Sequence, residues 1–440
     1  MLQNVIGGLQ GIIDHVMVGH FVGYTGNAAI GVSWQVFLVV TVFVSSLSTG
    51  MSVLVARFTG AGEMEKVHRT VHQAILSSLA ISFLVFAPIG YLLAPTLLDL
   101  INAAPEVQVE ALPYLRIVFC FGGGMTLYFT LGAALRSAGD ARTPLRLGMT
   151  ITVLNVVFNF VLIRGLGPIP ALGTAGAALG TSLAMGLVVG YALVALRRGV
   201  WVVRLPAGWS WRPDWGIIRA LFRFGLPAGA QGVAMTLAGA MLLGFIGSLA
   251  EGAAAQAAYA VVYTELFSLI TWTSIGLMGA AATVAGQNLG AGKPERAVGA
   301  VHTAATIAIA LAAGIGVLFY TIPSTLLSIF GMTDPVAVSL GVQLLGYLSV
   351  SGLFIAVALT YTGGLQGTGD TRSPLYISLI SQIGVPVGIC FLTQQLGTLE
   401  ATDIWRAILL GHITRCTLSV ARFRQGRWRG IEVAIEAGNR

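Results

Sequence analysis

Charged residues are scarce in this sequence. Only 9% of its 440 residues are Asp, Glu, Lys or Arg, whereas 56% are hydrophobic. A soluble domain carries about 25% charged residues, and a surface that faces water needs polar cover however large the core. We therefore expect lipid to be the solvent for most of the protein surface.

Cysteine pairs and catalytic motifs are also lacking. The three cysteines, Cys120, Cys390 and Cys416, fall in apolar stretches without paired spacing, which predicts neither a disulfide framework nor a metal site. The sequence has no zinc-hydrolase or nucleophile-elbow motif, and Gly367–Asp370 lacks the lysine of a phosphate-binding loop. We expect no enzyme, no cofactor and no nucleotide-driven motor, so energy would come from an ion gradient or from a partner.

Long continuous apolar runs take the place of these motifs. A membrane-spanning helix needs about 20 apolar residues, and backbone amides in lipid must be paired within the segment. The runs do not alternate with a period of two, which argues against a barrel. The sequence predicts an all-α polytopic membrane protein with twelve helices, over residues 2–22, 28–56, 70–95, 108–135, 145–164, 171–196, 217–248, 253–285, 297–323, 335–365, 375–396 and 403–423.

The basic residues predict the orientation of these spans. Most of the 24 lysines and arginines fall in the connections that follow even-numbered spans and in the C-terminal tail. The positive-inside rule then places both termini in the cytoplasm, with a prokaryotic inner (plasma) membrane as the expected location. Because topology explains the net charge of +7, we expect no nucleic acid partner.

Two halves of the chain are related by an internal repeat. Gly60-Ala61-Gly62 recurs 230 residues later as Gly290-Ala291-Gly292, and Gly139-Asp140 recurs at the same spacing as Gly369-Asp370. Each half has an even number of spans, so the halves would be related by a pseudo-two-fold axis along the membrane normal. The predicted organisation is an N-terminal six-helix lobe, a cytoplasmic linker, a C-terminal six-helix lobe and a cytoplasmic tail, over residues 1–196, 197–216, 217–425 and 426–440.

The repeated turns have a structural interpretation. Glycine permits a positive φ at the end of a helix, and a proline suits the start of the next one. We expect Asp140 and Asp370 to cap helices or to pair with Arg142 and Arg372.

Ionisable groups inside a membrane are costly and point to function. Asp14 lies well inside the first span, and Asn155 and Asn159 share one face of the fifth because they are spaced i, i+4. A carboxyl group in a low-dielectric cavity can bind and release a proton near neutral pH, and with polar partners it could hold Na⁺ instead. The alternatives are a structural carboxylate at Asp14 that pairs with His15 or with another helix, and asparagines that join helices.

The second half offers other polar candidates. Glu265 is the acidic one, and it stands at the repeat position of Gln35. His412 and Arg415 in the last span could contact substrate, although packing or a buried pair with Glu265 is an equal alternative. The residues that we expect to line a substrate cavity are Trp34, Gln35, Tyr128, Gln231, Tyr361 and His412.

These motifs, in this order and duplicated, resemble those of the multidrug and toxic compound extrusion (MATE) transporters. The resemblance rests on Asp14 to Gly19, on the two Gly-Ala-Gly turns, on the two Gly-Asp-x-Arg-x-Pro turns and on Gly176 to Thr181. It covers about residues 10–425. The family implies two lobes of six helices and cation-coupled antiport of lipophilic, often cationic compounds out of the cytoplasm.

Within that family the sequence is similar to the DinF-like branch. The resemblance places Asp14, Asn155 and Thr181 at ion-coupling positions, and these three residues could also hold Na⁺. Asn159 stands where the family pattern has a second aspartate. This departure removes one negative charge from the site and favours H⁺ over Na⁺ as the coupling ion. A family proline of the first span, matched by Pro227 in the second half, would map before Met1, so we expect the chain to begin late.

The function expected from the sequence is export of drugs, toxins or metabolites in exchange for H⁺. A Na⁺-coupled antiporter and a flippase for a lipid-linked precursor are the alternatives. We expect a monomer whose partners are a small-molecule substrate and membrane lipid. The sequence leaves the substrate open, because the shape-tolerant apolar walls of a multidrug cavity look like ordinary membrane core.

Overall fold

A computed structural model describes residues 14–101, 103–205, 211–433 and 435. These residues form helices and short connections, with one isolated bridge between Leu166 and Ile169. They divide into two compact units. The N-terminal unit reaches Gly229 and the C-terminal unit runs from Ala230 to Val433, so the division falls inside one long helix.

The N-terminal unit begins with helical residues 14–21 and ends with the first part of α9. Between them lie α2 (Tyr24–Gly60), α3 (Met64–Ala80), η1 (Ile81–Phe86), α4 (Ala87–Leu100), α5 (Pro105–Phe121), α6 (Gly123–Ser137), α7 (Arg142–Arg164) and α8 (Gly173–Arg197). Helix α9 covers Trp215–Gly247.

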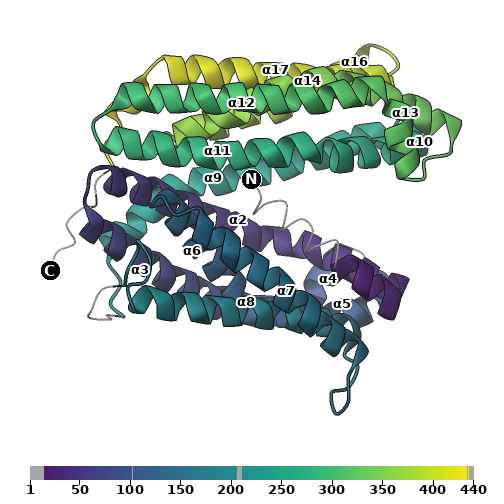
Figure 1. Cartoon of the computed structure of the whole chain (residues 1–440). Coiled ribbons are helices and arrows are strands. Elements are labelled where there is room, and N and C mark those ends of the chain that lie inside the picture. The colour runs from purple at the N-terminus through teal and green to yellow at the C-terminus, as the bar shows by residue number, and fades with distance from the viewer. Residues whose placement is uncertain (1–13, 102, 206–210, 434, 436–440) are drawn as a thin grey trace. The chain divides into compact units, whose positions relative to one another are not determined.

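The C-terminal unit contains the rest of α9 and the remaining helices (Figure 1). They are α10 (Gly252–Tyr259), η2 (Ala260–Leu266), α11 (Ser268–Gly290), α12 (Pro294–Thr321), α13 (Pro323–Ile329), α14 (Pro335–Thr368), α15 (Arg372–Ser378), η3 (Leu379–Gly384), α16 (Val385–Leu396), α17 (Ala401–Arg424) and η4 (Arg427–Gly430).

The predicted spans correspond closely to these helices. Among the described residues, nine helical stretches are long and apolar enough to cross a membrane, and the pair α5 and α6, bent by 50°, makes a tenth. Helix α17 occupies the predicted twelfth span. Most of the first predicted span, residues 2–13, lies outside the described residues. The all-α polytopic fold class is confirmed, and the predicted lobe boundaries stay predictions.

The repeated turns adopt the predicted backbone conformation in both units. Gly62 and Gly292 have φ of 76° and 70°, and Gly139 and Gly369 have φ of 98° and 103°. This left-handed region is costly for residues with a Cβ. The second glycine of each Gly-Ala-Gly and the glycine of each Gly-Asp pair therefore end a helix.

The two turn aspartates cap helices, which is the first of the two predicted alternatives, and in the second half the ion pair is made with another arginine than the one expected. Asp140 Oδ1 accepts hydrogen bonds from the backbone N–H groups of Arg142 and Thr143. Asp370 accepts the backbone N–H of Ser373 in the same way, yet its ion pair, at 2.8 Å, is with Arg422 at the end of α17. A residue distant in sequence therefore displaces Arg372 as the partner.

Helix α14 is the centre of the C-terminal unit. It packs against α11, α12 and α17, which run alongside it (Figure 1). Its buried leucines, among them Leu344, Leu345 and Leu348, join one apolar cluster with Phe267 and Trp405. Because α14 is buried on several sides, it gives the unit a fixed frame on which shorter helical pieces can sit.

Three π-helical segments interrupt the spans. They are η1 in the N-terminal unit and η2 and η3 in the C-terminal unit. A π-turn inserts one extra residue into a helix, which shifts the side chains on either side of it, and such insertions occur frequently at functional sites. Two of the three lie next to the pocket of the C-terminal unit.

Candidate functional site

The first described helix is held in the N-terminal unit by apolar packing. Val18 is fully buried and shares a cluster with Ile30 of α2, Ile163 of α7 and Ala177 of α8. Asp14 lies one helical turn before Val18, so the same packing points it toward α7 and α8.

The polar residues predicted on three spans come together at this place. Asn159 Nδ2 donates a 2.6 Å hydrogen bond to Asp14 Oδ1, and Asn155 Nδ2 donates a 2.8 Å hydrogen bond to Thr181 Oγ1. Asn155 and Thr181 also lie close enough to the Asp14 carboxyl group to interact with it. We call Asp14, Asn155, Asn159 and Thr181 the aspartate cluster.

The aspartate cluster contains oxygen atoms without a hydrogen-bond partner among the described residues. Both asparagines are fully buried, and the Oδ1 atom of each has no hydrogen-bond partner among the described residues. A buried acceptor without a partner is costly. A proton on the carboxyl group or a hard cation such as Na⁺, which prefers oxygen ligands, would satisfy these atoms.

The absence of a side chain at Gly180 of α8 makes room for Asn159. A Cβ added at Gly180 would collide with Asn159 Oδ1 and would lie 3.1 Å from the Asn159 backbone nitrogen. The small residue therefore allows α7 and α8 to approach at the level of the aspartate cluster.

The pairing of Asp14 with His15, one of the structural alternatives, is not found among the described residues. His15 Nδ1 lies 3.2 Å from Asn27 Oδ1 on α2, so the histidine has a partner of its own. No described lysine, arginine or histidine forms an ion pair with Asp14. Its described hydrogen-bond partner is a neutral amide, which leaves the charge of an ionised Asp14 uncompensated.

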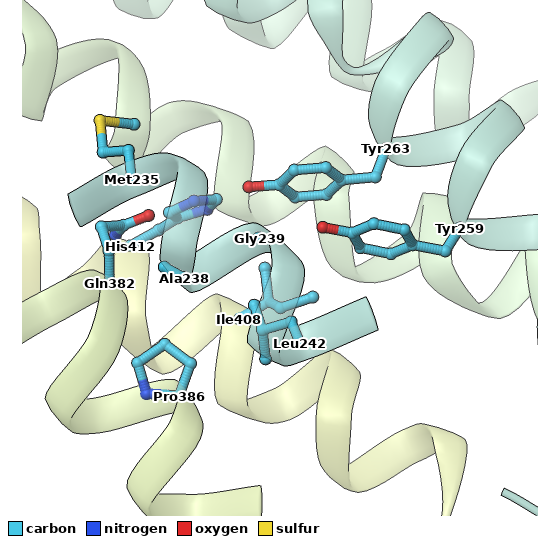
Figure 2. Close-up of a pocket in the computed structure, with 10 residues that line it drawn as sticks. All are labelled: Met235, Ala238, Gly239, Leu242, Tyr259, Tyr263, Gln382, Pro386, Ile408 and His412. Atoms are coloured by element: carbon cyan, nitrogen blue, oxygen red, sulfur yellow. The ribbon is translucent and has the colours of Figure 1, made fainter. Parts of the chain in front are cut away.

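The C-terminal unit holds a pocket of about 150 Å³ (Figure 2). Its wall residues are Met235, Ala238, Gly239, Leu242, Tyr259, Tyr263, Gln382, Pro386, Ile408 and His412. Tyr259 and Tyr263 are one turn apart, and their rings stack with centroids 4.8 Å apart. Figure 2 shows both hydroxyl groups directed toward the side of the pocket where His412 lies.

Arg415 lies beside this pocket in the middle third of α17. Its side chain is 1% exposed, and its described polar contact is a weak one, 3.9 Å from Nη1 to the Met235 sulfur. Arg415 Nε has no hydrogen-bond partner. Arg415 lies close enough to Tyr263 and His412 to interact with both electrostatically.

His412, one of the predicted cavity residues, lines the pocket. The ring is 2% exposed and stacks on Phe267 with centroids 5.7 Å apart. Ser351 Oγ on α14 is hydrogen-bonded to its Nδ1. This contact holds the ring in place from the side of α14.

Glu265, the second-half acidic candidate, does not form the pair with Arg415 that the sequence left open. The glutamate lies in η2 with its side chain exposed, and no described ion pair joins it to Arg415. Tyr263, two residues earlier, faces the pocket instead.

The other predicted cavity residues lie away from this pocket. Gln231 is buried and bridges helices: its Nε2 donates to Ser378 Oγ at 2.8 Å, and its Oε1 accepts from Gln366 at 3.1 Å. Tyr361 is buried in a core cluster, where its ring meets Phe423 edge to face.

The three candidates of the N-terminal unit share no described pocket. The Trp34 side chain is 55% exposed, Gln35 is exposed, and Tyr128 is half-buried with its ring against Phe129. The pocket described for this unit has a volume of about 10 Å³ and is lined by other residues of α2, η1, α5 and α6.

Sequence reasoning missed three polar wall residues of the larger pocket. Tyr259 and Tyr263 carry a signal that could have been used, because tyrosines spaced i, i+4 share a helix face. Gln382 is an amide inside an apolar span, and its Nε2 is buried without a partner among the described residues. Their convergence with Arg415 depends on packing between spans that are far apart in the chain.

A family model for MatE matches residues 1–161 and 227–392, one stretch in each half. The chain belongs to the MatE family. Members of this family are membrane transporters, and the predicted family is thereby confirmed.

Curated relatives of this MatE protein extend over nearly its whole length. "Probable multidrug resistance protein NorM" of Thermotoga maritima is 26% identical over 97% of this chain and 90% of its own length. "Probable multidrug resistance protein YoeA" of Bacillus subtilis is 24% identical over 92% of this chain and 87% of its own.

The fold of the MatE protein is also that of a solved transporter. An outward-facing multidrug resistance MATE family transporter of the MOP superfamily matches with a TM-score of 0.88, over 98% of this chain and 95% of the other, at 20% identity. The family match and the apolar helices together identify the chain as an integral membrane transporter. The DinF-like branch and the cytoplasmic termini stay predictions.

Proposed function

We propose that this MatE protein is a secondary active antiporter that exports lipophilic or cationic small molecules, such as drugs, toxins or metabolites, in exchange for H⁺. The observation that carries the proposal is the hydrogen bond from Asn159 to Asp14 inside the N-terminal unit. The relatives named as multidrug resistance proteins support the substrate class.

The chemistry of the aspartate cluster supports a proton as the coupling ion. Asp14 has no described cationic partner, so protonation removes a charge that is costly in a membrane. The protonated carboxyl group gains an O–H donor, and the unpaired Oδ1 of a neighbouring asparagine can accept it. Proton binding and release would thus change the hydrogen bonding between the first helix and α7.

The test uses full-length protein in liposomes loaded with a lipophilic cationic dye. An imposed pH gradient should drive dye transport by the wild type, and Asp14→Asn should reduce it at least about tenfold because the amide cannot titrate. Glu65→Gln is the matched control, since it removes one negative charge from an exposed residue of the same unit. Undiminished transport by Asp14→Asn would refute the proposal.

A Na⁺-coupled antiporter is the second candidate, and the unpaired asparagine oxygens favour it. Asp14, Asn155 and Thr181 would supply the oxygen ligands. In the same liposomes, a Na⁺ gradient without a pH gradient separates the two candidates. Transport under that condition, lost in Asp14→Asn, would replace H⁺ by Na⁺ in this account. The flippase alternative predicts movement of a lipid-linked substrate without either gradient.

The remaining expectations are part of the same proposal. We expect the protein to act as a monomer with no cofactor, in contact with membrane lipid and with a small-molecule substrate. Both termini would lie in the cytoplasm of a prokaryote, on the inner face of the plasma membrane.

A further inference from the structure

The pocket of the C-terminal unit has the size of one aromatic ring. A cavity of about 150 Å³ accommodates benzene in a soluble protein, and the pocket here has that volume. Its apolar wall includes Leu242, Pro386 and Ile408, and the stacked tyrosines form another side. The shape and the apolar lining suit a planar group.

The polar side of this pocket is rich in donors. Arg415 lies next to the wall residue Met235 and carries only N–H donors. Its Nε has no partner among the described residues, and neither has Nε2 of the wall residue Gln382. The hydroxyl groups of Tyr259 and Tyr263 can also donate, and Figure 2 shows both directed toward the side where His412 lies. Several convergent donors around a pocket require a ligand with acceptor atoms.

No described acid neutralises this side of the pocket. Arg415 has no described ion pair, and Glu265 is exposed on another face of η2. An arginine inside a membrane is costly and almost always pairs with an acid or a carbonyl group. Arg415 has no such partner among the described residues, and its Nη1 lies 3.9 Å from the sulfur of Met235, a residue of the pocket wall.

The local backbone at this pocket is unusual on two sides. Tyr263 belongs to η2 and Gln382 to η3, so two π-helical segments each supply one of the donors. A π-turn shifts the register of the side chains that follow it, and such turns are frequent at functional sites. This feature is independent of the charge of Arg415 and marks the same place.

We propose that this pocket binds the anionic end of an aromatic carboxylate, with Arg415 as the counter-charge and Tyr263 and Gln382 as further donors. A carboxylate offers two oxygens to the planar fork of an arginine and can accept two parallel hydrogen bonds. The inference rests on the proposed export function and extends it: aromatic amphiphiles with a carboxylate are substrates, in addition to the lipophilic and cationic compounds.

Three probes of equal size test this inference: benzoate, neutral benzamide and cationic benzamidine. Binding is measured by titration calorimetry on the full-length wild type in lipid nanodiscs. Benzoate should bind at least about tenfold more tightly than benzamide, because hydrogen bonds between ions are about twice as strong as neutral ones. Equal affinities, or tighter binding of benzamidine, would overturn the inference.

Variants at Arg415 assign the preference to this residue. Arg415→Gln should abolish the preference for benzoate over benzamide, and Arg415→Lys should restore part of it because the charge returns without the fork. A preference that survives Arg415→Gln overturns the inference. If that variant does not fold, Gln382→Leu decides. It keeps the charge of Arg415 and removes one neutral donor, so it should lower the benzoate preference about threefold, and an unchanged preference contradicts the role of the pocket.

The outcome is independent of the test of the export function. Binding of benzoate is an equilibrium property of the C-terminal unit and requires no gradient. A protein that binds benzoate preferentially but shows no Asp14-dependent transport would contradict the export proposal alone. A protein with Asp14-dependent transport and no preference for benzoate would contradict the pocket assignment alone.

Discussion

The two units of this transporter carry opposite charges in their interiors. In the N-terminal unit an acid, Asp14, lies among buried amides without a sizeable described pocket beside it. In the C-terminal unit a base, Arg415, lies beside a pocket that can hold an aromatic ring. If our two proposals hold, the difference teaches that a duplicated helical frame can be divided between ion coupling and substrate binding by substituting a few polar residues.

Among the substitutions that distinguish the roles of the two units, the largest effect on transport is expected at Gly180. Gly180→Ala places a Cβ against Asn159 and should lower pH-driven dye transport at least about tenfold, while binding of benzoate is retained. Gly186→Ala on the same helix is the control, since its added Cβ meets nothing within 4 Å. If Gly180→Ala lost benzoate binding, or if it kept full transport activity, the assignment of ion coupling and carboxylate binding to different units would be contradicted.

The choice of coupling ion can be shifted at Asn159. Asn159→Asp puts a second carboxylate beside Asp14 and should create transport driven by a Na⁺ gradient alone, roughly tenfold above wild type, because two carboxylates bind a cation more strongly than one. The measurement is dye transport with equal pH on both sides. Asn155→Ser, which adds no charge, should show no such gain. If Asn159→Asp showed no gain in Na⁺-driven transport, the number of carboxylates in the aspartate cluster would not determine the coupling ion.

The helix caps of the repeat provide a comparison of stability. Asp370→Ala loses a partly buried pair with Arg422 as well as a cap and should lower the free energy of unfolding by about 3 kcal/mol. Asp140→Ala, which removes the cap alone, should cost about 1 kcal/mol. Thermal unfolding in detergent checks both variants, and equal losses would mean that the Arg422 pair adds nothing. Arg372→Gln, the partner expected from the sequence, should leave stability almost unchanged.

The smallest effect is expected at the tyrosine hydroxyl groups. Tyr263→Phe keeps the stacked ring but removes one neutral donor, so the affinity for benzoate should fall about threefold to fivefold. Transport of the cationic dye should be unaffected because the aspartate cluster lies in the other unit. A fall in dye transport comparable to the fall in benzoate affinity would show that the two sites cannot be treated separately.

The helices and the repeated turns could be predicted from the sequence because their signals are local. Apolar runs of sufficient length predict spans, and the glycines at positive φ end helices in both units. The aspartate cluster could also be predicted from the sequence, because a carboxylate and two amides are rare in apolar segments. The i, i+4 spacing places Asn155 and Asn159 on one helix face.

The pocket of the C-terminal unit could not be predicted in the same way. Leu242, Pro386 and Ile408 look like any other membrane core residues, and they converge only through contacts between distant spans. The π-helical segments that carry Tyr263 and Gln382 depend on tertiary packing rather than on a local motif. For the same reason the partner of Asp370 is Arg422, which no local pattern indicates.

One measurement tests the central claim most directly: pH-driven dye transport and benzoate binding, determined side by side for wild type, Asp14→Asn and Arg415→Gln. The account predicts that Asp14→Asn loses transport and retains benzoate binding, and that Arg415→Gln loses the preference for benzoate and retains transport of the cationic dye. If either variant lost both properties as a folded protein, or if both variants retained both, the assignment of ion coupling and carboxylate binding to different units would be contradicted.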